Sequence, residues 1–185
     1  MSTFSEFHGI APISDEVIAR FADRVPTEIV ALWRELGAGL IGDGFLRIPD
    51  PAEASSWLPL IVDDPEGAVP VFTSALADIV VWQDGYFHNV CTRLDVAFPL
   101  SFSKPAHVVR FLEDPGLLER DFRWANYLPA VERLGVPELG ECLYYAPLLS
   151  LGGPEVPDTL QRGGFAAHLE VAAGFQGRIT IGSMD

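Results

Sequence analysis

Between Val69 and Leu100 the chain carries four short segments rich in β-branched and aromatic residues, and this block constrains the fold more than any other feature. The four segments are residues 69–73, 78–82, 86–91 and 95–98. Gln83-Asp84-Gly85 separates the second segment from the third and is typical of a tight hairpin turn. Strands this short and this closely spaced pair as antiparallel neighbours. The block therefore predicts an antiparallel meander.

Helical patterns precede this block. Ser14 stands before two acidic residues and an apolar repeat, which is typical of a capped helix start. Pro26 fits the first turn of a second helix, and Gly37 is placed to end it. The two segments predict an N-terminal helical hairpin. The glycine-rich stretch 37–44 lacks the spacing of a phosphate-binding loop and is predicted to be a turn, followed by a short strand over 45–48 that the Pro49-Asp50-Pro51 run closes.

Helical patterns return after the meander, over residues 104–112, 115–122 and 127–134. A strand over 140–147, a Leu151-Gly152-Gly153 loop and a helix over 166–173 complete the chain. The expected fold class is α+β: an antiparallel sheet flanked by helices, with the N-terminal helical hairpin and a C-terminal strand-loop-helix unit.

The chain is strongly acidic, with 26 Asp and Glu against 12 Lys and Arg and a formal net charge of −14. Such a surface repels phosphates, so neither a nucleic acid nor an anionic membrane is an expected partner. A basic protein is the natural complement, because opposite potentials speed association. The alternative is that the charge serves solubility alone. Because no Lys or Arg lies between Arg47 and Arg93, the acidic field is expected to be regional.

Catalytic and metal-binding patterns are weak. The four histidines lie in separate elements, and only His88 and Cys91 stand at metal-like spacing. On a strand, positions three apart face opposite sides of a sheet, which argues against a zinc site. Neither cysteine has an evident base, and there is no G-x-S-x-G motif. We expect no catalytic residues, no metal and no cofactor.

The start of the sequence resembles no export signal, and no apolar run approaches the about 20 residues that span a bilayer. A cytoplasmic location is therefore expected. Within the base-free stretch, two acidic turns are expected to form part of a partner surface together with nearby aromatic residues. The candidate partner-binding residues are Asp63, Asp64, Glu66, Asp84, Trp57 and Tyr86. The acidic segment 138–158 is the next candidate.

Several motifs resemble the bacterial GAD-like domain proteins, a family that includes immunity proteins paired with type VI secretion nuclease effectors. In the first half these are residues 4–13 before a helix, Val25-Pro26 with Trp33 and Gly37, Gly42-Asp43-Gly44, and the run 73–82 ending in Trp82. In the second half, residues 139–153 and then His168-Leu169 resemble the family's aromatic strand, Leu-Gly-Gly loop and His-Leu helix.

The resemblance implies two halves, a GAD-like half over 1–100 and an immunity-type half over 101–185, packed as one unit. It also implies that the chain neutralises a cognate secreted toxin, which we expect to be a basic nuclease, by protein–protein contact and without catalysis. Two alternatives stay open: an adaptor or effector-chaperone module, and a small hydrolase whose site the sequence does not reveal.

Overall fold

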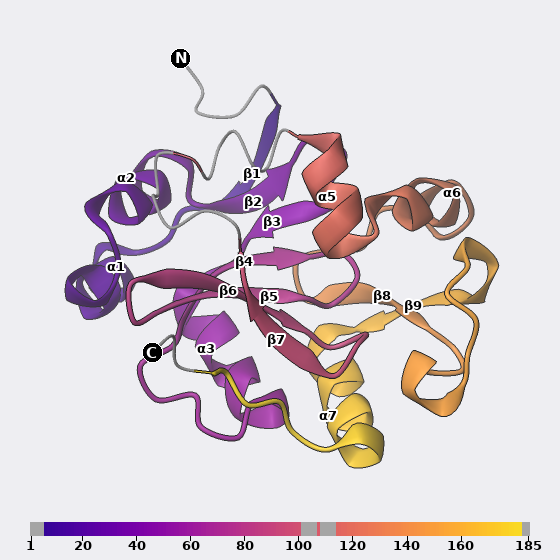
Figure 1. Ribbon diagram of the computed structural model, residues 1–185. Helices are drawn as coiled ribbons and strands as arrows, with labels where there is room; N and C mark the ends of the chain where they lie inside the picture. The colour runs from indigo at the N-terminus through magenta and orange to yellow at the C-terminus, as the bar shows by residue number, and fades with distance from the viewer. Residues whose placement is uncertain (1–5, 101–106, 108–113, 183–185) are drawn as a thin grey trace.

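A seven-stranded antiparallel sheet forms the centre of the structure, a computed structural model that describes residues 6–100, 107 and 114–182. The strands are neighbours in chain order, from β1 at one edge to β7 at the other (Figure 1). Their bounds are β1 Phe7–Ala11, β2 Ala38–Ile41, β3 Leu46–Ile48, β4 Val69–Ser74, β5 Ile79–Gln83, β6 Tyr86–Cys91 and β7 Val96–Pro99.

The predicted meander is confirmed as β4 to β7, and the expected α+β fold class is confirmed with it. Gln83 pairs with Tyr86 across the hairpin turn, whose central residues Asp84 and Gly85 have φ of 51° and 85°. Positive φ at both positions is the geometry of a type I′ turn, which matches the twist of the two strands it joins.

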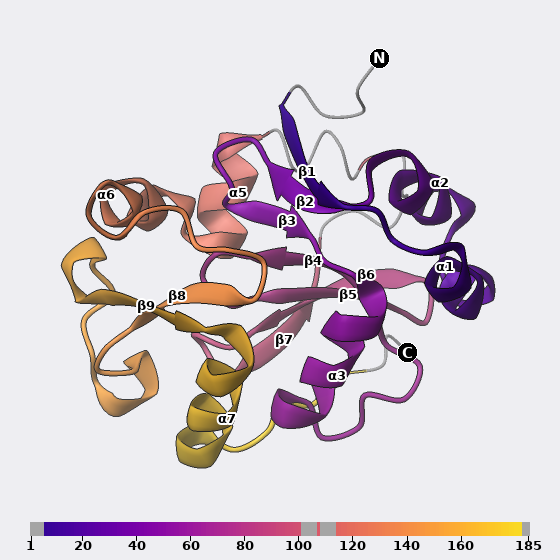
Figure 2. The same ribbon diagram turned by 180° about the vertical axis from the view of Figure 1, so that it is seen from behind.

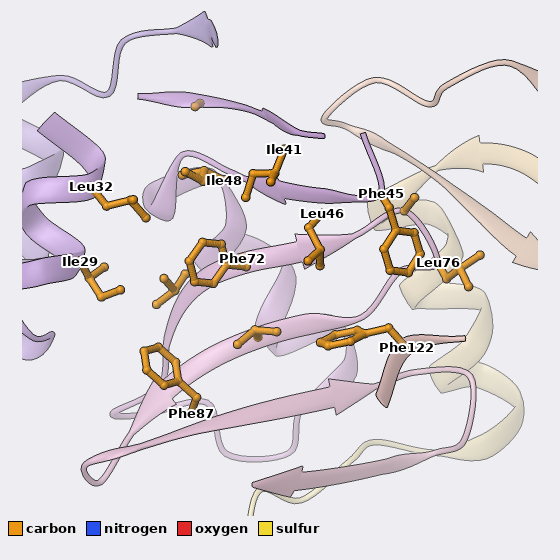
Figure 3. Packing of buried hydrophobic residues seen from close by; sticks show 14 of the residues in the cluster. Ile29, Leu32, Ile41, Phe45, Leu46, Ile48, Phe72, Leu76, Phe87 and Phe122 are labelled. Carbon is orange, nitrogen blue, oxygen red and sulfur yellow. The ribbon is translucent and has the colours of Figure 1, made fainter. Parts of the chain in front are cut away.

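Both faces of the central strands are buried, each under its own apolar core, while the edge strands β1 and β7 are more exposed. Along β5 the side chains alternate: Val80 belongs to one core, and Ile79 and Val81 belong to the other. The first core includes residues of α1, α2, α5 and α6. Figure 3 shows part of it, including Ile29 and Leu32 of α2 and Phe122 of α5. The second includes residues of α3 and α7, which lie across the opposite face in Figure 2. The helices are α1 Asp15–Phe21, α2 Thr27–Leu36, α3 Pro51–Ile61, α5 Pro115–Phe122, α6 Trp124–Leu134 and α7 Phe165–Gln176.

The N-terminal helical hairpin is confirmed as α1 and α2, joined by the short 3-10 helix Ala22–Arg24. The Ser14 hydroxyl accepts a hydrogen bond from the Val17 amide at 3.3 Å, and Gly37 ends α2 with a φ of 70°. Among the described residues, no helix is long and apolar enough to cross a membrane. The helix predicted over 104–112 lies outside the described residues apart from His107.

Helix α3 was not predicted, because the Pro49-Asp50-Pro51 run was interpreted as the end of a strand. Instead, Asp50 caps the helix: its carboxylate accepts from the Ala52 and Glu53 amides at 2.7 and 3.4 Å. Pro51 occupies the first turn, where a missing amide hydrogen costs nothing. On its buried face, Trp57 stacks on Phe165 of α7 with ring centroids 4.6 Å apart.

The turn predicted over 37–44 is wrong for its first part, since residues 38–41 form β2 between β1 and β3. Gly39 permits this pairing: a Cβ atom there would lie 2.5 Å from the His8 carbonyl oxygen. The strand β1 was not predicted either. Gly42 and Gly44, with φ of 59° and 85°, do form the expected turn after β2.

At the C-terminal end the predicted strand is confirmed as β8 Glu141–Tyr145, but it pairs with an unpredicted strand, β9 Leu160–Gly164. The 3-10 helices Leu149–Leu151 and Pro157–Thr159 lie in the connection between them. Helix α7 follows β9 directly, so the unit is a hairpin followed by a helix. Both cores contain side chains from both predicted halves, and the boundary at residue 100 stays a prediction.

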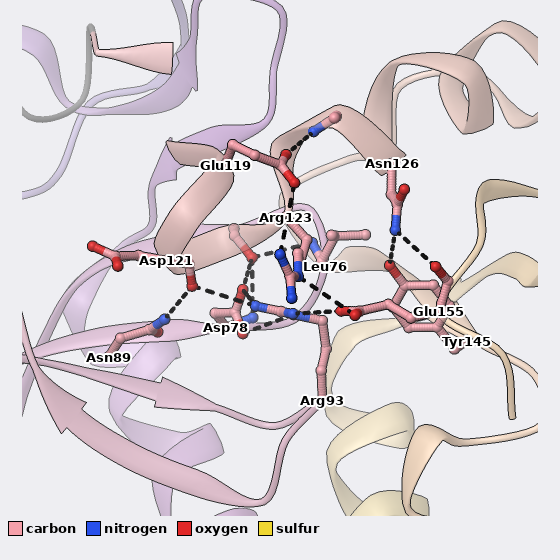
Figure 4. Close-up of polar contacts among 12 residues, drawn as sticks. Leu76, Asp78, Asn89, Arg93, Glu119, Asp121, Arg123, Asn126, Tyr145 and Glu155 are labelled. Carbon is pink, nitrogen blue, oxygen red and sulfur yellow. Dashed lines mark hydrogen bonds and ion pairs between the residues drawn. The ribbon is translucent and has the colours of Figure 1, made fainter. Parts of the chain in front are cut away.

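A buried ion pair joins this C-terminal unit to the sheet (Figure 4). Asp78, at the start of β5, and Arg93, in the turn after β6, lie 3.4 Å apart with almost no exposure. Burial raises the pKa of Asp78, an effect that Arg93 and the hydrogen bond from the Ser74 hydroxyl at 2.8 Å oppose. Burial alone would lower the pKa of Arg93, but the Asp78 carboxylate raises it overall. Arg93 is therefore held as a charged group inside the protein.

The remaining donors of Arg93 reach two other parts of the chain. One donates to the Asp121 carbonyl of α5 at 3.4 Å, and another to the Glu155 carboxylate at 3.3 Å. Arg123, between α5 and α6, also pairs with Glu155 at 3.4 Å. A backbone bond from the Leu143 amide to the Ala75 carbonyl, 2.7 Å long, fastens β8 beside this network. Helix α5, the start of α6 and the C-terminal hairpin thus meet the sheet in this region.

The ring stack between α3 and α7 generates the first prediction. Trp57→Ala is expected to lower the free energy of unfolding by about 3–5 kcal/mol, because it leaves a cavity in the second core. Urea denaturation measures this loss. Phe175→Ala is the control: this ring is 63% exposed on the outer side of α7, so a change under about 0.5 kcal/mol is expected. Equal losses for the two variants would contradict the packing described here.

The buried ion pair between Asp78 and Arg93 generates the second prediction. Asp78→Ala is expected to lower the free energy of unfolding by about 3–5 kcal/mol, because Arg93 would stay buried without its main counter-charge. The control is Glu132→Ala, which removes an exposed carboxylate from α6. That change is expected to cost under about 1 kcal/mol. A loss under 1 kcal/mol for Asp78→Ala, measured in the same way, would show that the pair is not needed.

Candidate functional site

The two acidic turns lie at the same end of the sheet. Val69 pairs with Trp82, so the turn before β4 and the turn after β5 are neighbours, as both views of the ribbon show (Figures 1 and 2). Asp63, Asp64, Glu66 and Asp84 are all exposed. Both acidic turns therefore lie at this end of the sheet, and their four exposed carboxylates are called here the acidic end.

The acidic end also borders two cations. Arg20 and Arg24 line a shallow hollow together with Asp64 and Glu66. Arg20 and Arg24 lie over the ring of Phe21, with 4.9 and 5.7 Å between guanidinium carbon and ring centroid. The exposed charges are therefore negative on the two turns and of both signs beside α1.

The two predicted aromatic residues differ in position. Tyr86 is partly exposed at the base of the β5–β6 turn, next to Asp84. Trp57 is only 6% exposed and stacks on Phe165 inside the second core. The Trp57 ring therefore packs inside the protein in this structure. A role in partner binding stays a prediction for the other five candidate residues, Asp63, Asp64, Glu66, Asp84 and Tyr86.

Arg47 and Arg93, which flank the stretch without Lys or Arg, are both buried. Arg47 is fully buried and donates to the carbonyls of Glu138 and Glu141 at 3.3 and 2.6 Å. Burial lowers its pKa to about 10. Asp78, counted from sequence among the acids of this stretch, is internal as well. Neither Arg47 nor Arg93 neutralises the surface near the acidic turns.

A second candidate surface is an apolar pocket in the C-terminal unit, with a volume of about 320 Å³. It opens to solvent between the start of the β8–β9 connection and the outer side of α7. Its wall includes Tyr144, Pro147, Leu148, His168, Val171 and Phe175. None of the described residues lining it carries a full charge, so the pocket favours an uncharged apolar group.

His168 is the polar group in this wall. The residue is 8% exposed, and its imidazole stacks on the Tyr144 ring with centroids 5.0 Å apart. Burial lowers the pKa of His168 to about 4, so the ring is neutral at physiological pH. The imidazole has no hydrogen-bond partner among the described residues. One neutral donor and one acceptor are therefore available at the pocket wall.

The pocket is built from the C-terminal motifs singled out in the sequence. Gly163 of β9 lies against the Tyr144 ring, where a Cβ atom would come within 2.9 Å of it. Gly153 closes the loop against Pro147, whose carbonyl oxygen would be 2.0 Å from an added Cβ atom. The aromatic strand, the Gly-Gly loop and the His-Leu helix thus meet at one place. Sequence reasoning did not recognise these positions as a site, although their motifs were the available signal.

The described residues contain no group of three or more His, Cys, Asp or Glu side chains that could hold a metal ion. Both cysteines are buried and free, and burial raises the pKa of Cys142 to about 12. For Cys91, burial also raises the pKa, and the nearby Asp78 carboxylate adds to the effect. Both thiols therefore stay protonated and weakly nucleophilic.

Three comparisons with known proteins bear on these surfaces. Residues 104–176 match the sequence model of a family described as "T6SS immunity protein Tdi1, C-terminal". No curated protein matches the chain. Among solved structures, the crystal structure of Atu4351 from Agrobacterium tumefaciens is similar, with a TM-score of 0.73 and 18% sequence identity over 92% of this chain and 85% of that one. The structural similarity establishes a shared fold. The segment that matches the family model, residues 104–176, contains every pocket residue named above.

Proposed function

We propose that this chain is an immunity protein that binds a cognate toxin delivered by type VI secretion and neutralises it by direct contact. The observation that carries the proposal is the match of residues 104–176 to the type VI immunity model. The matched segment includes α5, α6, β8, β9 and all of α7, and so forms a continuous part of the structure rather than an isolated motif. We also propose that residues 1–100 form a GAD-like half, a region that the match to residues 104–176 does not cover.

The two surfaces support binding of a protein. The acidic end suits long-range attraction of a basic partner, because exposed like charges act together over about a Debye length. The apolar pocket suits short-range contact, because apolar area removed from water supplies most of the free energy of association. A protein of net charge −14 that also exposes apolar side chains fits a basic protein partner.

The finer part of the proposal is that the toxin is a nuclease. A nuclease must bind a polyanion and therefore presents a basic cleft, which an acidic protein can occupy. Since the nucleic acids at risk lie in the cytoplasm of the producing cell, the immunity protein is proposed to act there. Blocking would follow from occupation of the toxin, with no chemical step performed by this chain.

Two other functions predict different behaviour. An adaptor or effector chaperone would bind the toxin and leave it active. A small hydrolase would remove toxicity at amounts well below one equivalent of the toxin. Stoichiometry and residual toxin activity in the bound state therefore separate the three functions.

The first test uses the proteins encoded by the open reading frames next to the gene for this chain. Each is expressed from an inducible promoter in a bacterial host, with and without this chain. We expect one neighbour to stop growth and to degrade plasmid DNA or RNA in vitro. Co-expression of this chain is expected to restore growth, and titration in vitro is expected to abolish nuclease activity at one equivalent.

Other outcomes contradict specific parts of the proposal. If no neighbour is toxic, or if the toxic neighbour kills equally with this chain present, immunity is wrong. If this chain neutralises a toxic neighbouring protein that cleaves no nucleic acid, the immunity function stands and the nuclease part of the proposal is wrong. Neutralisation at a small fraction of one equivalent would favour the hydrolase.

The acidic end generates a further prediction about association. Asp63→Asn, Asp64→Asn, Glu66→Gln and Asp84→Asn combined are expected to slow association with a catalytically disabled toxin about tenfold at low salt, and to flatten its salt dependence. The dissociation rate should change little, because exposed charges act mainly on encounter. Biolayer interferometry at several salt concentrations measures both rates.

The matched control removes four other exposed carboxylates: Asp95→Asn, Glu132→Gln, Glu138→Gln and Asp158→Asn. Both variants change the net charge equally, so a difference between them reports the position of the charges rather than their number. If the control slows association and the first variant does not, the partner contacts a face of the molecule other than the acidic end.

A further inference from the structure

Helix α7 is apolar on both of its sides, yet only one side is buried. Phe165, Leu169 and Ala172 face the second core against α3. Ala167, Val171 and Phe175 follow one another at four-residue spacing on the outer side, with Val171 51% and Phe175 63% exposed. A helix that is apolar all round is ordinarily buried all round. An exposed apolar patch of this kind beside a pocket marks an interaction site.

His168 provides a second, independent sign of a ligand. It lies at the pocket wall, more than nine-tenths buried and without a hydrogen-bond partner among the described residues. Its ring nitrogens are not among the fully buried atoms that lack a partner, so they reach the solvent, and an entering group has only to replace water there. A group that enters the pocket and offers a donor or acceptor beside an apolar body would satisfy the imidazole.

The net charge argues against a second copy of this chain as the occupant. Two molecules of net charge −14 repel each other on approach. A basic protein is attracted instead, and the acidic end already favours such a partner. The pocket itself bears no full charge on its described lining, so the inserted group must be uncharged even when its carrier is cationic.

We propose that this pocket receives one large apolar side chain, aliphatic or aromatic, projected from the surface of the toxin, with an adjacent backbone group of the toxin hydrogen-bonded to His168. This inference rests on the proposed function and adds the anchor point. A cavity of about 320 Å³ is large enough for such a side chain. Val171 and Phe175 stand at its rim, where they exclude water from the inserted group, as the residues around an interface hot spot do.

The anchor and the acidic end therefore act on different rate constants. A desolvated apolar anchor breaks only when the complex separates, so its loss raises the dissociation rate. Exposed carboxylates act before contact, so their loss lowers the association rate. Variants at the two surfaces can be distinguished by kinetics even when their equilibrium affinities fall equally.

The test uses the catalytically disabled toxin identified above and two variants of the full chain, Val171→Glu and Phe175→Ala. Val171→Glu is expected to raise the dissociation rate about thirtyfold or more and Phe175→Ala about tenfold, with association within about twofold of wild type. The matched control is Ile10→Glu on β1, which adds the same charge at a position 55% exposed, and no change in dissociation is expected. Urea denaturation of each variant verifies that it is folded.

The outcomes are separable from those of the immunity test. If wild type neutralises the toxin and both pocket variants dissociate at the wild-type rate, the pocket is not the anchor, while the immunity function stands. If wild type does not bind the toxin at all, the proposed function itself fails. Light scattering on the wild-type protein alone is expected to give a monomer. A dimer that Val171→Glu dissociates would identify a second copy as the occupant and overturn the proposal.

Discussion

The Asp78–Arg93 ion pair is the buried interaction around which the sheet, α5 and the β8–β9 connection meet. Both groups are removed from water, so neither can be left without its partner, and Arg93 needs further acceptors to satisfy its five donors. Those acceptors come from α5 and from the β8–β9 connection. One buried cation thus contacts three parts of the chain: the start of β5, the end of α5 and the β8–β9 connection.

Elements governed by local signals were predictable from the sequence. Alternating β-branched residues and the Asp84-Gly85 turn specify the meander, and Ser14 and Gly37 specify where the first two helices begin and end. Elements governed by distant pairing were missed. Residues 161–164 have little β propensity and become strand β9 only because β8 lies beside them. Helix α3 was hidden because Asp50-Pro51 can end a strand as well as begin a helix.

The candidate site shows the same division. Acidic turns are recognisable as exposed because Asp, Pro and Gly gather in them, but their proximity depends on the register between Val69 and Trp82. The sequence also does not show which acidic residue pairs with a buried arginine. The buried Asp78 could therefore not be distinguished from the exposed acidic residues of the same stretch. The pocket joins Tyr144, Pro147 and His168 from separate elements. Their motifs were visible, while the cavity between them exists only in three dimensions.

Helix α7 separates folding from recognition within a single element. Its inner positions maintain the core through the Trp57–Phe165 stack, and its outer positions contribute nothing to that core. Substitutions at 167, 171 and 175 can therefore accumulate without endangering the folded state, and each changes the shape that a partner meets. Under the proposed function, such a scaffold adapts to a changed toxin by altering one solvent-facing row of side chains, while the interior that holds the row in place stays the same.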